Sequence, residues 1–82
     1  MKSKVKIYPI KIEDIVYPRR LSEEYYSQEE LLKMVELIKN GDTTNVIVVK
    51  FSSSGYELVR GSIVFEAYKL LDRKIIPAYI LR

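Results

Sequence analysis

The sequence contains neither cysteine nor histidine. Without a thiolate or an imidazole, the chain has no ligands for the usual zinc and haem sites and no base for Ser–His or Cys–His catalysis. Disulfides are excluded as well, which fits a reducing cytoplasm. Carboxylates could still hold a magnesium ion, but no spacing of the acidic residues singles out a site, so we predict no resident metal.

Long apolar runs are also missing. Lysines interrupt every apolar segment of the N-terminal stretch MKSKVKIYPIKIED, so we predict neither a signal peptide nor a membrane span. Of the 82 residues, 48% are hydrophobic and 30% are charged, a composition typical of globular chains. A chain of this length has room for one core, so residues 1–82 are expected to form a single cytoplasmic domain.

The formal net charge is +3, and its sign changes along the chain. Residues 1–20 and 43–82 are rich in lysine and arginine, whereas residues 21–42 are acidic. If the two basic segments meet in space, they form a surface that attracts anions. The alternative is an ordinary solvated surface of mixed sign.

Two segments have the period of amphipathic helices. Ser27 and Glu30 have the spacing of a capping box, and Asn40–Gly41 is a typical helix end, so we predict a helix between them. A second helix is expected after Gly61–Ser62. The predicted apolar faces are Leu31, Leu32, Val35, Leu37 and Ile38 in the first helix and Val64, Ala67, Tyr68 and Leu71 in the second.

Alternating or β-branched apolar residues predict four strands, so the expected order is β-α-β-β-α-β in an α+β fold. In the first strand Val5 and Ile7 are expected to face the core. Because proline lacks the ladder N–H, Pro77 is expected to confine the last strand to an edge or a bulge. The segments are a strand at 4–8 closed by Pro9, a helical turn near 10–15, a loop at 17–26, a hairpin of strands 46–51 and 56–60, and a strand at 75–81.

One stretch, Tyr56 to Ser62, runs from a strand through a glycine directly into a helix. The first amides of a helix lack partners within it and carry the positive end of its dipole, so this corner is suited to hold a phosphate. Gly61 would let a ligand approach the main chain. The alternative is a plain tight turn without a ligand.

The ordered pieces of the chain resemble the ParB/sulfiredoxin-like family over nearly the whole sequence. The match to the Tyr-Glu-Leu-Val-x-Gly signature is close, and the other pieces follow in the family's order. The segments that carry the resemblance are Pro18-Arg19-Arg20, Glu36 to Gly41, Val46 to Lys50, Tyr56 to Gly61, and Ala67 to Ala78.

The resemblance implies a small domain with a mixed sheet of about four strands and two main helices. Members of the family bind nucleotide or nucleic-acid phosphates, and include partition proteins that use CTP, a reductase, nuclease-like proteins and a small-molecule kinase. Where the family has Gly-Glu-Arg-Arg-x-x-Ala, this chain has Gly61-Ser62-Ile63-Val64-Phe65-Glu66-Ala67. Both arginines that would clamp phosphate are replaced by apolar residues, and the missing cysteine excludes sulfiredoxin activity.

The candidate phosphate contacts are expected to converge from the early loop and the glycine corner. Glu36 matches a family carboxylate and is the one catalytic candidate; the alternative is that it is a solvated residue on the helix surface. Tyr17, Tyr25 and Tyr26 are candidate surfaces for base stacking. The predicted nucleic-acid or phosphate-binding residues are Arg19, Arg20, Lys50, Arg60, Gly61 and Ser62.

These observations favour a non-catalytic ParB-like domain that binds nucleic-acid or nucleotide phosphate in DNA maintenance, plasmid partition or gene regulation. A nucleotide with magnesium is the only cofactor that the resemblance suggests. One alternative is an enzyme of the CTPase, nuclease or kinase type that uses Glu36. Another is an interaction module that forms a homodimer or binds a larger protein through the edge strand near Pro77 or the acidic helix.

Overall fold

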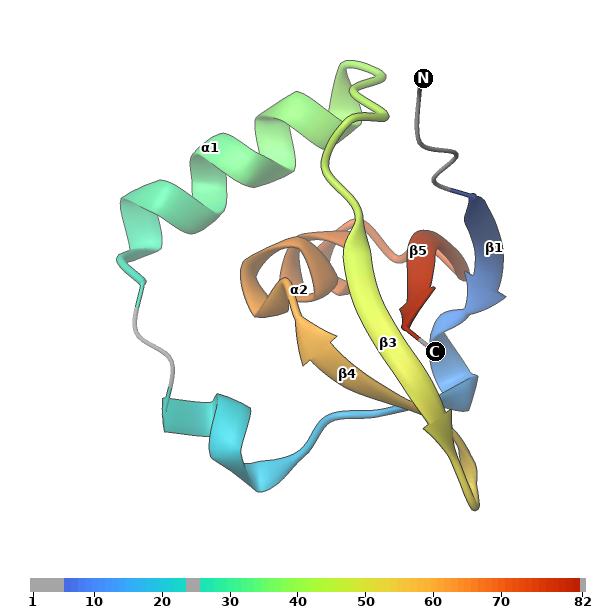
Figure 1. The fold of residues 1–82 in the computed structure, drawn as a ribbon. Coiled ribbons are helices and arrows are strands. Elements are labelled where there is room, and N and C mark those ends of the chain that lie inside the picture. Colours follow the sequence, from blue (N-terminus) through green and yellow to red (C-terminus); the bar gives the residue numbers. More distant parts are fainter. Residues whose placement is uncertain (1–5, 24–25, 82) are drawn as a thin grey trace, which may run out of the picture.

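The computed structural model describes residues 6–23 and 26–81, which form one five-stranded sheet and two α-helices. The helix α2 lies against one face of the sheet, and α1 lies beside α2 (Figure 1). The elements are β1 (Ile7–Lys11), η1 (Ile12–Asp14), β2 (Ile15–Val16), η2 (Arg19–Glu23), α1 (Gln28–Lys39), β3 (Ile47–Ser52), β4 (Gly55–Arg60), α2 (Ser62–Leu70) and β5 (Ile75–Leu81).

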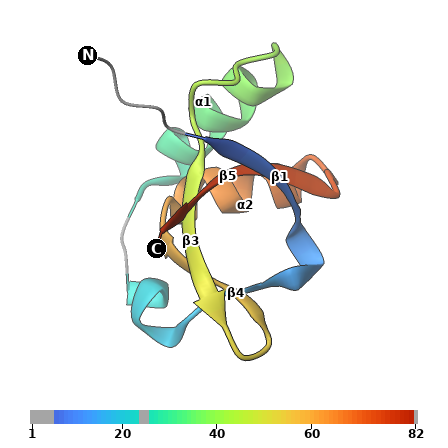
Figure 2. The same cartoon turned by 45° about the vertical axis from the view of Figure 1, so that its right-hand side comes forward.

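The strand order is β1-β5-β3-β4-β2, and the sheet is mixed. The pairs β1–β5 and β3–β4 are antiparallel, whereas β3–β5 and β2–β4 are parallel. Figure 2 shows how the hairpin of β3 and β4 extends beyond the rest of the sheet. The predicted α+β class and the hairpin are confirmed. The strand that was not predicted is β2, which has two residues and is too short to give a periodic signal in the sequence.

The core lies between α2 and the sheet. In β5 the residues Ile76, Ala78 and Ile80 are buried, and their neighbours in the strand are more exposed. This period of two places one face of the strand toward α2. The predicted apolar face of α2 is confirmed, because Val64, Ala67 and Tyr68 are buried and Leu71 packs against the same core.

The ends of α1 are fixed as predicted. The Ser27 hydroxyl accepts the Glu30 amide at 3.0 Å, and the Ser27 amide donates to Glu30 Oε1 at 2.8 Å. At the other end Gly41 has φ +94°, the left-handed conformation that closes such helices.

The predicted apolar face of α1 is partly wrong. Ile38 is buried, but Leu32 and Leu37 are 55% and 49% exposed. The helix packs against α2, and this contact leaves Leu32 and Leu37 largely uncovered.

The first strand differs from the prediction, and Val5 lies outside the described residues. β1 continues through Pro9 to Lys11 rather than ending at Pro9. Tyr8 and Ile10 face the core because they pair with the buried Ala78 and Ile76 of β5. Ile7, which was expected in the core, is exposed.

The position of Pro77 was also predicted wrongly. It lies in β5, between β1 and β3, and not in an edge strand. Pro77 stands opposite Pro9, and two prolines cannot exchange N–H bonds, so this is a non-hydrogen-bonded position of the antiparallel ladder. The ring nitrogen of Pro77 therefore faces β3, whose pairing with β5 begins only at Ala78.

The segment predicted as a loop, 17–26, contains the short helix η2. Leu21 of this helix is buried in the core, and the Tyr17 hydroxyl donates to its carbonyl at 3.3 Å. The helical turn expected near residues 10–15 is present as η1.

Candidate functional site

A groove of about 530 Å³ lies between α1 and the junction of β4 with α2. The α1 side chains that line it are spaced by three or four positions, as on one face of a helix. On the other side the chain passes from the last residue of β4 into the first turn of α2. The described lining residues are Tyr26, Glu30, Lys33, Met34, Leu37, Arg60, Gly61, Ser62 and Ile63.

Gly61 forms the corner of this groove and has φ +99°. A Cβ atom at this position would lie 3.2 Å from both Cα and Cγ2 of Ile47. Glycine is therefore required by the backbone conformation and by close packing on β3. This packing, rather than the approach of a ligand that the sequence suggested, accounts for the residue.

The N-terminus of α2 opens into the groove without a side-chain cap. The Phe65 amide donates to the Gly61 carbonyl at 2.9 Å and so joins the helix to its N-cap. The first amides of a helix have no partner within it and carry the positive end of the dipole, and this end of α2 faces the groove. Ser62, the first residue of α2, is 1% exposed.

Two cations and one carboxylate are the charged groups among the described lining residues. Arg60 projects from the end of β4, and Lys33 from the facing side of α1; both are exposed. The carboxylate of Glu30 is held by the Ser27 amide in the capping box. The described lining residues thus carry a net charge of about +1.

Of the predicted binding residues, Arg60, Gly61 and Ser62 meet in the groove, whereas Arg19, Arg20 and Lys50 are not among its lining residues. The expected convergence of the early arginines on the glycine corner is therefore not found.

Arg20 instead lies 4.0 Å from the Glu57 carboxylate. Lys50 stands opposite Glu57 in the β3–β4 register. Glu57 thus lies between two of the cations that were expected at the corner, while Arg19 lies exposed in η2. Glu36 is exposed on α1 and also lies outside the groove lining.

The tyrosines between residues 17 and 26 lie in different surroundings. Tyr17 packs against Phe65, with ring centroids 5.6 Å apart, and serves the core. Tyr26 lines the groove, as expected for a stacking surface. Tyr25 lies outside the described residues.

The sequence interpretation missed the contribution of α1. Lys33, Met34 and Leu37 line the groove, yet Leu37 was assigned to the core face of the helix. Its spacing of four from Lys33 places both side chains on one face. That spacing is the signal in the sequence that could have identified them.

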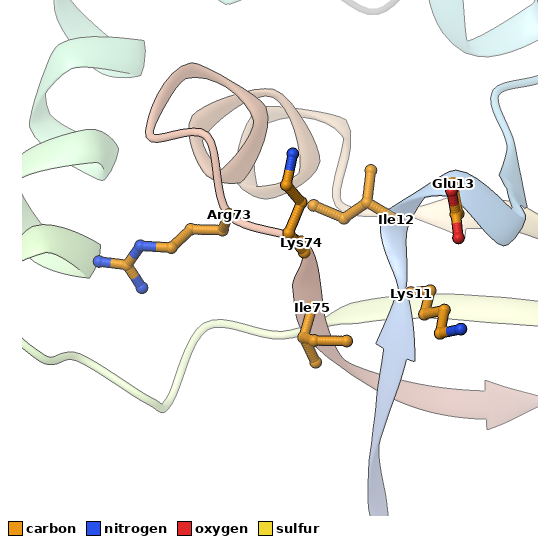
Figure 3. Close-up of a pocket in the computed structure, with 6 residues that line it drawn as sticks. All are labelled: Lys11, Ile12, Glu13, Arg73, Lys74 and Ile75. Atoms are coloured by element: carbon orange, nitrogen blue, oxygen red, sulfur yellow. The ribbon is translucent and has the colours of Figure 1, made fainter.

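A second pocket, of about 380 Å³, lies where the end of β1 meets the turn before β5. The Ile12 amide donates to the Lys74 carbonyl at 2.9 Å and thereby joins the two segments that line the pocket. Its cations, Lys11, Arg73 and Lys74, point in different directions (Figure 3), and Lys74 lies 3.7 Å from Asp72. The side chains do not converge on one ligand.

Residues 6–23 and 26–81 contain neither a cluster suited to a metal ion nor a membrane-spanning helix. No cluster of three acidic side chains with the arrangement of a metal site occurs there. Neither described helix is long and apolar enough to cross a membrane.

Comparison with known proteins identifies one family and several solved structures with a similar fold. Residues 1–82 match the family model described as the ParB N-terminal domain. No curated protein matches the sequence.

Among solved structures, the chain is similar to C-terminally truncated ParB from Caulobacter crescentus complexed with CTP-γ-S (18% identity, TM-score 0.79). The match covers 94% of this chain and 44% of the ParB chain. Sulfiredoxin from Arabidopsis thaliana is similar as well (19% identity, TM-score 0.81, covering 94% and 85%). A free serine kinase in complex with AMP has 21% identity and a TM-score of 0.74, covering 96% and 32%. The chain thus spans less than half of the ParB and kinase structures, and these identities show the fold alone.

Proposed function

This chain belongs to the ParB N-terminal domain family, and we propose that it binds the phosphate of a nucleotide, free or within a nucleic-acid strand, in the groove between α1 and α2, without catalysing a reaction. The observation that carries the proposal is the meeting of Arg60, Lys33 and the uncapped start of α2 around one groove. ParB, which has a similar fold, was solved in complex with CTP-γ-S, and a second ParB structure is a complex with the centromeric parS site.

The groove offers the three kinds of donor that proteins use for phosphate. A guanidinium makes charge-assisted, bidentate hydrogen bonds to phosphate oxygens. An ammonium group adds a mobile point charge, and the helix start adds main-chain donors. Arg60 and Lys33 come from opposite walls, so a phosphate between them would be contacted from both sides.

The absence of a placed acid or base from the described lining supports a binding role over the enzyme alternative. Glu30 is the carboxylate of the groove, and it already accepts the Ser27 amide. Glu36, the catalytic candidate from the sequence, lies outside the lining. A general base must reach the reacting proton directly or through one water.

The wider biological assignments rest on the family and the sequence. DNA maintenance, plasmid partition or gene regulation, a cytoplasmic location and a homodimer stay predictions. If the ligand is a nucleic-acid strand, log Kobs should fall linearly with log[salt], with a slope that reflects the number of phosphates neutralised.

The proposal is tested by calorimetric titration of the chain at low salt with AMP, CMP, CTP, single-stranded DNA and duplex DNA. Arg60→Gln removes the guanidinium and is expected to weaken binding by about tenfold or more, the value of a charged hydrogen bond. Lys33→Gln is expected to weaken it less, because a point charge is more readily replaced by water.

The matched control is Lys50→Gln, which removes an exposed cation from β3, outside the groove lining. We expect its affinity to equal that of the unchanged chain. Equal losses from the Arg60 and Lys50 substitutions would move binding to the broader basic surface and refute the groove. Absence of binding to all five ligands would refute the function itself.

A further inference from the structure

The composition of the groove also limits which nucleotide it accepts. Its described charged residues are two cations and one carboxylate. A triphosphate carries several more negative charges than a single phosphate, and the described lining residues include no cation beyond Arg60 and Lys33 to meet them. Placing extra phosphate oxygens there without partners costs free energy, because they lose hydration without gaining hydrogen bonds.

Glu30 makes this limit sharper. Its carboxylate is fixed by the bond from the Ser27 amide at 2.8 Å, so it cannot swing away without breaking the capping box. It lies one helical turn from Lys33 on the same wall of the groove. A chain of phosphates extending along α1 would meet this negative charge, and repulsion would increase with every added phosphate.

Ile63 occupies the opposite wall directly after the helix start. It is partly buried, lines the groove and packs against the core. A phosphate group placed beyond the Gly61–Ser62 corner would therefore lie on an apolar side chain that offers no hydrogen bond.

The remaining lining is suited to the rest of a nucleotide. Leu37 is 49% exposed, and it lies with Met34, Ile63 and Tyr26 in the groove. An aromatic base can cover this apolar surface and stack on the tyrosine ring. The same groove therefore combines room for one base with donors for one phosphate.

From these observations we infer that the ligand carries a single phosphate beside its base, as in a nucleoside monophosphate or one unit of a single strand, and that the groove discriminates against nucleoside di- and triphosphates. This inference rests on the proposed function, since it specifies the ligand of the same groove. The base supplies the apolar contact, and Arg60, Lys33 and the start of α2 supply the phosphate contacts.

The test measures dissociation constants of the unchanged chain for AMP, CMP, ATP and CTP, the last two with and without magnesium, and for a short single-stranded oligonucleotide. We expect each monophosphate to bind at least as tightly as its triphosphate. Binding of the oligonucleotide alone would assign the phosphate to a strand, whereas binding of the monophosphates assigns it to a free nucleotide; either result supports the inference.

Two substitutions are expected to relax the discrimination. Glu30→Gln removes the negative charge while its amide oxygen can still accept the Ser27 amide, and it should improve triphosphate binding by about threefold relative to monophosphate binding. Ile63→Arg supplies a guanidinium at the helix start and should improve the same ratio by about tenfold.

The control for the first is Glu36→Gln, which removes a carboxylate from the same helix outside the groove lining, and the control for the second is Ile63→Met. Neither should change the ratio. If the unchanged chain binds CTP or ATP about tenfold more tightly than the monophosphate, the inference is wrong and the proposed function still stands. If no nucleotide or strand binds, the proposed function itself has failed.

Discussion

At residue 61 the backbone has to turn out of β4 with φ +99° while it passes against Ile47 of β3. An L-residue pays a steric cost in this conformation, and a side chain would also press on the backbone of β3. The sheet and α2 can approach each other as closely as they do because this position has no Cβ atom. The N-terminal end of α2, where we propose that the phosphate binds, is thus placed by packing on β3.

Gly61→Ala is expected to lower the free energy of unfolding by about 2–4 kcal/mol, through backbone strain and crowding together. Gly41→Ala is the matched control, because Gly41 has a similar φ of +94° but a Cβ there would meet nothing within 4 Å. It should cost about 1–2 kcal/mol from strain alone. Urea denaturation of both variants gives the comparison. A Gly61 variant as stable as the Gly41 variant would show that the contact with Ile47 yields without cost.

Closeness in the sequence explains which residues of the candidate site could be predicted. Arg60, Gly61 and Ser62 are consecutive, so the change from strand to helix places them together in any fold. Lys33 and Leu37 join them only because α1 packs beside α2. This is a tertiary contact, which a single sequence does not indicate. The contact of Arg20 with Glu57 of β4 is a tertiary contact of the same kind, which the sequence alone does not indicate.

Among the elements, α1 is specified almost entirely by local interactions. The capping box begins it, and Asn40–Gly41 ends it. The connection to β3 is also local: Asp42 accepts hydrogen bonds from Thr44 Oγ1 at 2.8 Å and from Asn45 Nδ2 at 2.7 Å. The helix could be predicted because its signals lie within it and beside it.

The Asp42 turn predicts a dependence of stability on pH. Hydrogen bonds from the side chains of Asn45 and then Thr44 lower the pKa of Asp42 below its ordinary value of 3.8. Since the pKa is lower in the folded chain than in the unfolded one, this contribution to stability is present above the ordinary pKa. It is lost as the pH falls through the folded value.

Asp42→Asn is therefore expected to lose less unfolding free energy than the unchanged chain between about pH 6 and about pH 3, as measured by urea denaturation at each pH. Asp14→Asn makes the same chemical change at an exposed side chain of η1 and serves as the control. Identical acid sensitivity of the Asp42 variant and the unchanged chain would contradict the role of this turn.

The strands were harder to predict than the helices. The hairpin of β3 and β4 was visible because its turn is short and local. The neighbours of β5 and the existence of β2 depend on pairing between residues far apart in the sequence. The rule that assigns proline to an edge strand applies where its nitrogen faces a hydrogen-bonded residue of the next strand. The Pro77 nitrogen faces β3 just before the β3–β5 pairing begins at Ala78, so the missing N–H removes no bond of that ladder.

For the whole molecule, β1 is one edge of the sheet. Pro9 stands in the middle of this strand, opposite Pro77. Since the pair is a non-hydrogen-bonded position, the Pro9 nitrogen faces away from β5 and toward the open edge. A missing donor at the centre of an exposed edge discourages pairing with another strand.

Pro9→Val restores that donor and is expected to increase self-association at high concentration, as measured by light scattering across a dilution series. Pro77→Val is the control, since its N–H would face β3 inside the sheet and create no new edge. If the Pro9 variant has the same mass as the unchanged chain at every concentration, this proline does not protect the edge.

The pairing of β1 with β5 also has a consequence for the timing of folding on the ribosome. β1 is synthesised before the other strands, yet its strand neighbour in the sheet is β5, which follows all of them in the sequence. Until then β3 lacks one of its two partners, and the apolar side of α2 has an incomplete sheet to cover it. Formation of the native sheet therefore has to wait until β5 has emerged, as expected where distant segments must meet before their contacts compensate for the entropy of joining them.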